Sequence, residues 1–218
     1  MAFVVAIDGP AASGKGTLAR RLAERFGLAH LDTGKLYRAA AFLVLQQEAD
    51  AADPAAAEAA ARRVDPALLG EPRLLSEAVA NASSVVAAMP AVRAALLAFQ
   101  REFATHPSPP AQGAVLDGRD IGTAVCPEAT VKLFVTASPE ARAERRVREL
   151  RERGAAAIYG DVLQDMKERD ARDSSRRVAP LAAAPDAIIL DTTGLDANEV
   201  FEQASDIIAR ALPADRQP

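Results

Sequence analysis

A glycine-rich loop near the N-terminus constrains the fold of this chain more than any other feature. It occupies residues 9–17 and reads Gly-Pro-Ala-Ala-Ser-Gly-Lys-Gly-Thr. An apolar, strand-like run at residues 3–7 precedes it, and a helical pattern at about residues 15–26 follows it. Glycines allow the backbone to curl so that successive N–H groups converge, and a helix N-terminus adds positive potential. Strand, loop and helix in this order predict a phosphate-binding loop in an α/β fold.

This loop is expected to bind ATP through nine successive residues: Gly9, Pro10, Ala11, Ala12, Ser13, Gly14, Lys15, Gly16 and Thr17. Lys15 would bring a point charge to the bridging and terminal phosphates, and we expect it to be catalytic. The Ser or Thr that usually follows this lysine is replaced by Gly16, and Thr17 comes one position later. The Mg²⁺ that accompanies ATP is therefore expected near Thr17 or Asp117, directly or through water.

Strand-like and helical segments alternate along the rest of the chain. Further apolar runs occur at residues 29–31, 114–117, 131–135 and 187–191. Helices are expected at about residues 36–47, 74–88, 90–103, 139–153, 161–173 and 198–212, with short helices and loops in the Ala-rich stretch 49–72. The alternation predicts a parallel sheet that binds its ligands at the carboxyl ends of the strands.

Composition argues against several classes of protein. No apolar run approaches the ~20 residues of a membrane span, and no signal-peptide pattern or apolar interface repeat is evident, so we expect a cytoplasmic monomer with no membrane partner. One cysteine, Cys126, fits a reducing compartment. The net charge of −4 argues against a nucleic-acid partner. Residues 142–177 nevertheless carry 11 basic and 8 acidic side chains, which indicates a local anionic ligand or a salt-bridged helix face.

Two charged clusters follow strand-like runs, where an acceptor molecule would lie. The first reads Asp-Thr-Gly at residues 32–34 and continues to Arg38, which could hold an anion or be an ordinary surface residue. The second reads Asp-Gly-Arg-Asp at residues 117–120, and a solvated turn is its alternative interpretation. Asp117 could organise the metal and its waters, or simply cap a turn.

Arginines dominate a third cluster. Its members have the spacing of one helix face: Arg169, Arg172, Asp173 and Arg176. Glycines at positions 154 and 160 break the helical pattern and make a mobile lid plausible. Mobile arginines can surround a migrating phosphoryl group and exclude water.

With these pieces in place, the chain resembles the bacterial cytidylate kinases, a branch of the nucleoside monophosphate kinases. The resemblance covers about residues 3–212 and rests on five segments, at residues 7–17, 31–38, 79–85, 117–123 and 167–173. It implies a P-loop NTPase fold with a five-stranded parallel sheet and helices on both faces. It also implies transfer of the γ-phosphoryl group of ATP to CMP or dCMP. The single domain would comprise a core (about 1–40, 112–140 and 160–218), a helical acceptor-binding insert (about 41–111) and an Arg-rich lid (about 141–160).

The resemblance also assigns roles to individual residues. Those expected to bind the acceptor are Ser84, Arg93 and Asp120 for cytosine, Arg38, Arg119 and Arg176 for the phosphate, Arg169 and Asp173 for the ribose, and Thr33. The lid arginines expected to be catalytic are Arg145, Arg153 and Arg172. An Asp can accept from the exocyclic amino group of cytosine while an Arg donates to its ring nitrogen. Uracil has an acceptor in place of that amino donor and a donor in place of that ring-nitrogen acceptor, and each buried mismatch costs roughly 1–3 kcal/mol.

Two alternatives and two departures accompany this interpretation. The alternatives are a kinase for another acceptor, such as shikimate, dephospho-coenzyme A or thymidylate, and a regulator that hydrolyses or senses ATP. An anionic acceptor needs no general base, so His30 is expected to be structural.

Relatives often carry a β-rich segment in the insert, whereas residues 49–72 favour helices or a shortened insert. Ala12 stands where many relatives have glycine, which is tolerable if its φ stays negative.

Overall fold

The computed structural model describes residues 2–212 and confirms the expected five-stranded parallel sheet. The strand order is β2-β3-β1-β4-β5. The strands are β1 (Phe3–Asp8), β2 (Ala29–Asp32), β3 (Gly113–Gly118), β4 (Val131–Thr136) and β5 (Ile188–Asp191). Each overlaps the apolar run that predicted it. Residue 1 and residues 213–218, which the sequence analysis assigns to the core, lie outside the described residues.

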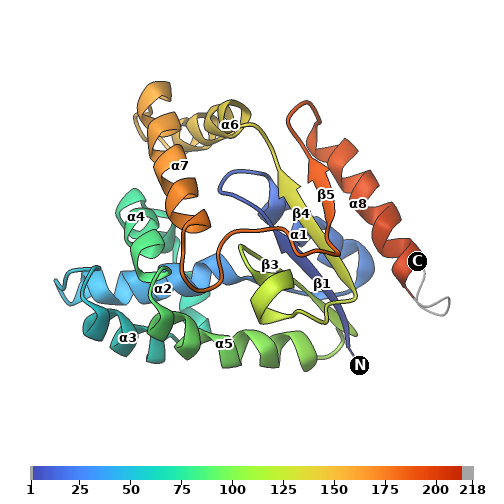
Figure 1. The fold of residues 1–218 in the computed structure, drawn as a ribbon, viewed down its shortest axis with the longest axis horizontal. Coiled ribbons are helices and arrows are strands. Elements are labelled where there is room, and N and C mark those ends of the chain that lie inside the picture. The colour runs from blue at the N-terminus through green and yellow to red at the C-terminus, as the bar shows by residue number, and fades with distance from the viewer. Residues whose placement is uncertain (1, 213–218) are drawn as a thin grey trace.

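Helices cover both faces of this sheet, and two more lie beyond the carboxyl ends of its strands (Figure 1). The helices are α1 (Lys15–Phe26), α2 (Thr33–Gln46), α3 (Pro54–Arg62), α4 (Glu77–Val86), α5 (Pro90–Thr105), α6 (Pro139–Glu152), α7 (Tyr159–Ser174) and α8 (Ala197–Ala211). One core lies between the sheet and α1 with α8, and includes Ile7, Leu22 and Ile208. The other lies between the sheet and the helices of residues 33–105, and includes Leu36, Val86 and Leu116.

No single helix within residues 2–212 is long and apolar enough to cross a membrane. Among the described helices, α4 and α5 taken together are the one pair that reaches that length and composition, and they are bent by 100° at their junction.

Local capping explains where several helices begin and end. Gly27 ends α1 with a φ of +62°, which glycine adopts without steric cost. Ser138 accepts a hydrogen bond from the Ala141 N–H at the start of α6, with proline at the first helical position. Asp53 caps α3 in the same way, and the short turns η1 (Pro66–Gly70) and η2 (Pro72–Leu75) follow. The Ala-rich stretch is therefore helical, and the described residues between β2 and β3 include no strand.

Three local expectations were wrong. The helix expected from residue 74 begins only at Glu77, because Ser76 accepts a hydrogen bond from the Val79 N–H and caps it. Arg176 is not on the face of α7, because that helix ends at Ser174. Ala12 has a φ of +56°, not a negative value, so the loop imposes a left-handed conformation on an alanine.

The strand register brings the ends of three strands together. Asp32 of β2 is the partner of Asp117 in β3, and Asp8 of β1 is the partner of Gly118. Directly after β1, a Cβ added to Gly9 would lie 2.0 Å from the Val135 carbonyl oxygen, so only glycine fits between the strands there. The phosphate loop therefore leaves the sheet at a rigid point, beside the loops that follow β2 and β3.

Candidate functional site

The phosphate loop presents a lysine, Lys15, that forms no ion pair with another described residue. The Lys15 ammonium donates a hydrogen bond of 3.2 Å to the Pro10 carbonyl across the loop. Burial, followed by the nearby Arg119, lowers the Lys15 pKa to about 7. The buried Ser13 hydroxyl has no hydrogen-bond partner among the described residues. A loop with an unpaired lysine and a free hydroxyl is suited to an anionic ligand.

Two carboxylates lie beside this loop. Asp117 is buried, its Oδ1 lies 2.8 Å from His30 Nε2, and its Oδ2 would lie 3.7 Å from a Cβ added to Gly16. Burial and the neighbouring Asp117 raise the Asp32 pKa above its usual range. Two carboxylates at the adjacent ends of β2 and β3 would gain from a divalent cation. The described residues hold no cluster of three or more His, Cys, Asp or Glu ligands, so water and phosphate oxygens would have to complete a metal shell.

A cavity of about 340 Å³ adjoins the phosphate loop on the α8 side. It is lined by Ser13, Gly14 and Thr17 of the loop and by Arg145 and Thr192. Arg145 donates to the Thr192 hydroxyl over 2.9 Å, which fixes the guanidinium at the edge of the cavity. Three of the nine predicted ATP-binding residues therefore line one space with Arg145.

A second, smaller cavity of about 50 Å³ lies beside the carboxyl end of β3, where Asp120 forms a buried ion pair with Arg93 of α5. The Arg93 guanidinium also stacks 5.3 Å from the centre of the Tyr37 ring and donates to the Ala87 carbonyl over 3.2 Å. Ser84 lines the same cavity. The three side chains predicted to face cytosine thus line one pocket.

Cations surround the rim of this pocket. Asp173 is buried and accepts hydrogen bonds from Arg119, over 3.0 Å, and from Arg176. Although burial opposes it, these two arginines lower the Asp173 pKa. Arg176 thus reaches the predicted site from beyond the end of α7.

Arg38 and Arg169 are the other predicted phosphate and ribose contacts. Arg38 donates to the Leu74 carbonyl over 2.8 Å. Arg169 makes no hydrogen bond or ion pair with another described residue, and its buried Nε has no partner. Burial and the nearby Arg119 lower its pKa to about 10. Both line the small pocket, so two guanidinium groups are available for an anion there.

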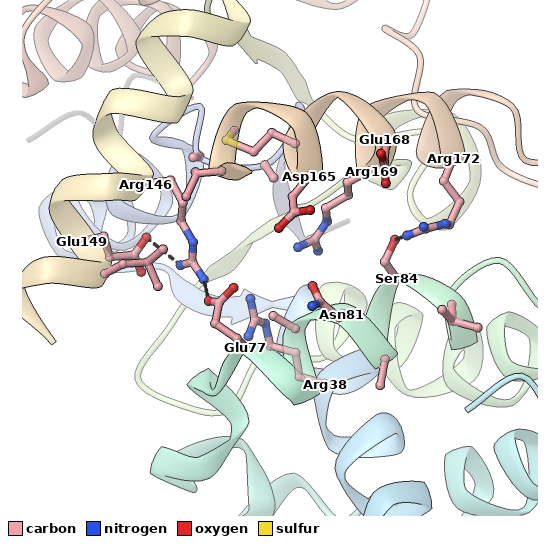
Figure 2. Close-up of a pocket in the computed structure, with 18 residues that line it drawn as sticks. Arg38, Glu77, Asn81, Ser84, Arg146, Glu149, Asp165, Glu168, Arg169 and Arg172 are labelled. Carbon is pink, nitrogen blue, oxygen red and sulfur yellow. Dashed lines mark hydrogen bonds and ion pairs between the residues drawn. The ribbon is translucent and has the colours of Figure 1, made fainter. Parts of the chain in front are cut away.

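A larger cavity of about 520 Å³ separates α4 from α6 and α7 (Figure 2). Its inner end reaches Ala11 and Ala12 of the phosphate loop. In Figure 2, Asp165 and Arg169 point from α7 into the space opposite Asn81 of α4.

Two polar contacts join the walls of this large cavity. Arg172 of α7 donates to the Ser84 hydroxyl over 2.9 Å. Arg146 of α6 pairs with Glu77 of α4 and, over 2.9 Å, with Glu149.

Two predicted site residues make different contacts. Arg153 follows α6, pairs with Glu149 over 2.6 Å and lines none of these three cavities. Thr33 is buried, and its hydroxyl donates to the Asp117 carbonyl over 2.8 Å, which holds the start of α2 against the end of β3.

The structure adds residues that the sequence analysis did not single out. Arg142 is buried and donates to the carbonyl of Ala11 over 3.3 Å and to Asp170 over 2.6 Å, so it links the phosphate loop to α7. Asp8 accepts two backbone hydrogen bonds from the turn after Asp120. Asp8 is an acidic residue at the end of a strand, and this position, which it shares with Asp117, was the sequence signal that could have indicated its role.

Comparison with known proteins gives a consistent picture. A profile of the cytidylate kinase family matches residues 5–210. A cytidylate kinase from Rhodospirillum rubrum is 60% identical over 207 residues, covering 95% of this chain and 97% of its own length. One from Paramagnetospirillum magneticum is 59% identical over 208 residues, covering 95% and 98%. An uncharacterised protein from Eubacterium ventriosum, of known structure, aligns with a TM-score of 0.51 at 15% identity, covering 95% and 96%, which shows the fold alone.

Proposed function

The chain belongs to the cytidylate kinase family, and from this premise we propose that its cleft transfers the γ-phosphoryl group of ATP to CMP or dCMP. The products are ADP and CDP or dCDP. The single observation that carries the proposal is the buried Arg93–Asp120 pair, in a pocket at the edge of the sheet next to the phosphate loop. This pair offers one donor and one acceptor to a cytosine edge.

ATP is held by the phosphate loop in this proposal. The backbone N–H groups of residues 9–17 and the Lys15 ammonium receive the phosphates, and the N-terminus of α1 adds positive potential. Nucleoside contacts come from the cavity beside Arg145 and Thr192. Because the hydrogen-bond acceptor of Lys15 among the described residues is a neutral carbonyl, the phosphates give its charge a stronger partner.

CMP occupies the pocket between α4, α5 and the end of β3. Asp120 accepts from the exocyclic amino group, Arg93 donates to the ring nitrogen, and Ser84 completes the base edge. Arg38, Arg119 and Arg176 hold the phosphate, and Arg169 and Asp173 reach the ribose. Uracil would place a carbonyl acceptor against the Asp120 carboxylate and a ring N–H donor against the Arg93 guanidinium. These two mismatches would favour CMP over UMP by on the order of 30-fold to over 10⁴-fold.

A phosphate oxygen of CMP attacks the γ-phosphorus of ATP, and the bond from that phosphorus to the bridging oxygen of ADP breaks. The attacking oxygen is already anionic, so positioning and charge neutralisation replace a general base. Arg145 and Arg172 approach the transferred group from α6 and α7 as catalytic arginines. Arg153 would join them only if α6 and the loop after it moved.

Mg²⁺ is proposed as the companion of ATP. Asp117, Asp32 and the Thr17 hydroxyl would hold it, at least partly through water, because two adjacent carboxylates lie beside the loop. The ion would neutralise the β- and γ-phosphate oxygens during transfer.

The proposal includes movement of two segments. Residues 41–111 form an acceptor-binding insert and residues 141–160 a lid, and both close on the substrates over the core. The enzyme is proposed to be a cytoplasmic monomer that binds neither nucleic acid nor membranes. Size-exclusion chromatography with light scattering tests the monomer directly.

ADP formation from ATP·Mg²⁺ tests the function, with CMP, dCMP, UMP, AMP, dTMP, shikimate or no acceptor in parallel. We expect strong turnover with CMP and dCMP, weak turnover with UMP and almost none without an acceptor. Turnover with a different acceptor would contradict the base assignment. ADP release without any acceptor would contradict the kinase proposal itself.

A further inference from the structure

The turn after Asp120 is held at both ends by charged side chains that contact neither substrate in the proposed complex. This turn, η3 (Ile121–Val125), begins directly after Asp120. The Asp120 carbonyl accepts hydrogen bonds from the N–H groups of Ala124 (2.9 Å) and Val125 (3.2 Å). The backbone of Asp120 is therefore part of the turn, and any shift of the turn moves its carboxylate.

Asp8 holds the beginning of η3. Its Oδ1 accepts from the Ile121 N–H and its Oδ2 from the Gly122 N–H, both over 2.7 Å. Asp8 is only 4% exposed, so these two N–H groups replace most of the water that an exposed carboxylate would have. Burial raises the Asp8 pKa to about 6, the two hydrogen bonds oppose this, and the charge of Asp120 adds to the rise while that of Lys15 opposes it.

Arg101 holds the other end. It lies on α5 and donates from Nε to the Val125 carbonyl over 3.1 Å and from Nη2 to the Ala124 carbonyl over 3.0 Å. The carboxylate thus meets the N–H end of the turn and the guanidinium meets its carbonyl end, which is the favourable arrangement for both charges. The same helix carries Arg93, so α5 contacts both the Asp120 carboxylate and the far end of its turn.

We propose that Asp8 and Arg101 are positioning residues that clamp η3 at its two ends and thereby aim the Asp120 carboxylate at the acceptor base. The inference rests on the proposed function, because that function gives Asp120 the task of reading cytosine. Asp8 leads directly into Gly9, where the backbone contacts Val135 too closely for any side chain. The clamp therefore fixes the base-reading carboxylate relative to the loop that holds the ATP phosphates.

Substitutions that weaken the clamp leave every proposed substrate contact in place. Asp8→Asn keeps the size of the side chain but has one acceptor oxygen, so its amide NH₂ would face a backbone N–H. Arg101→Gln removes the guanidinium from an exposed position, so we expect little effect on folding. Arg101→Lys restores a cationic donor to the same carbonyls. Asp53→Asn is the matched control, because Asp53 also accepts two backbone N–H groups, at the start of α3, away from the site.

The experiment measures the CMP Kd by calorimetry and the ratio of kcat/KM for CMP to that for UMP. For Asp8→Asn we expect a weakening of CMP binding and a fall in the CMP/UMP ratio of roughly tenfold each. Arg101→Gln should lower the ratio by about threefold to tenfold, and Arg101→Lys should recover part of it. Asp53→Asn should leave the ratio unchanged.

An unchanged CMP/UMP ratio in both Asp8→Asn and Arg101→Gln would overturn the clamp, even if stability or overall turnover fell. The same conclusion would follow if only ATP binding weakened, since Asp8 would then serve the phosphate loop. These outcomes differ from failure of the proposed function, in which the unaltered enzyme itself would not use CMP.

Discussion

Arg172 on α7 donates a hydrogen bond of 2.9 Å to the Ser84 hydroxyl on α4 and so joins the two walls of the acceptor cleft. In the proposed complex the Ser84 hydroxyl contacts cytosine, and Arg172 contacts the transferred phosphoryl group. The pocket beside them has a volume of about 50 Å³, far below the 300–1,000 Å³ of typical ligand pockets. In the proposed complex CMP would therefore extend from this pocket into the adjoining cavity of about 520 Å³, which Ser84 and Arg169 also line, and Arg172 would release Ser84.

Substituting Arg172 should separate binding from catalysis. Arg172→Met frees Ser84, so we expect the CMP Kd to stay level or decrease, while kcat falls by about 100-fold or more because a cation is lost from the transition state. Steady-state kinetics and calorimetry with CMP check both. Arg177→Met is the control, since Arg177 is exposed just beyond α7. A kcat equal to that of the control would remove Arg172 from catalysis.

Removing the Asp120 carboxylate should impair the acceptor site alone. We expect Asp120→Ala to lower kcat/KM for CMP by about 100-fold or more, since both the cytosine contact and the Arg93 partner are lost. The free energy of unfolding should also fall by about 3–5 kcal/mol, because Arg93 would be buried without its counter-charge. ATP binding should be nearly unchanged. Unaltered KM and turnover for CMP would show that the base lies elsewhere, and Asp186→Ala, at an exposed carboxylate, is the control.

The lowered Lys15 pKa predicts that ATP binding takes up a proton. Without ligand the Lys15 pKa is about 7, and a bound phosphate chain favours the charged ammonium, so the pKa rises on binding. ATP affinity should then fall by about tenfold per pH unit above 7. Calorimetry between about pH 7.5 and 9, in buffers of different ionisation enthalpy, measures this uptake directly. Lys15→Arg should abolish the uptake, because arginine stays charged; a flat pH profile for the unaltered enzyme would refute the prediction.

Replacing Ala12 by glycine should stabilise the folded protein. Its φ of +56° costs an alanine about 1–2 kcal/mol, whereas glycine adopts it freely but loses more chain entropy on folding. We expect Ala12→Gly to raise the free energy of unfolding by up to about 1 kcal/mol in urea titrations. Ala11→Gly, at a neighbouring residue without positive φ, should lower it instead. If both substitutions destabilised the protein equally, backbone strain at Ala12 would not matter.

Much of the fold could be predicted because its signals are local. The apolar runs at residues 3–7 and 131–135 fill buried strands, and Gly27 and Ser138 mark helix ends through their own backbone chemistry. The phosphate loop could be predicted for the same reason, since the strand, the glycines and Lys15 are contiguous in sequence.

The remaining features depend on contacts between distant residues. The φ of Ala12 is imposed by the loop as a whole, and the end of α7 at Ser174 leaves Arg176 beyond the helix. Arg142 and Asp8 have their partners 28 and 113 residues away, respectively. No periodicity within a single segment shows that two such groups will meet, so buried ion pairs and carboxylate caps became evident only in the structure.

The register of β3 also limits how the length of this chain can change. β3 pairs with β2 on one side and β1 on the other, and Asp117, Arg119 and Asp120 emerge from its end. One inserted residue within β3 would turn each later side chain to the opposite face and disrupt the metal-side and base-side groups together. The Ala-rich stretch before α4 ends no strand, so relatives can differ in length there at little cost to the site. Insertions and deletions should accordingly collect in the loops on either side of α3, whose Ala57, Ala60 and Ala61 are buried in the core, and be absent from residues 113–120.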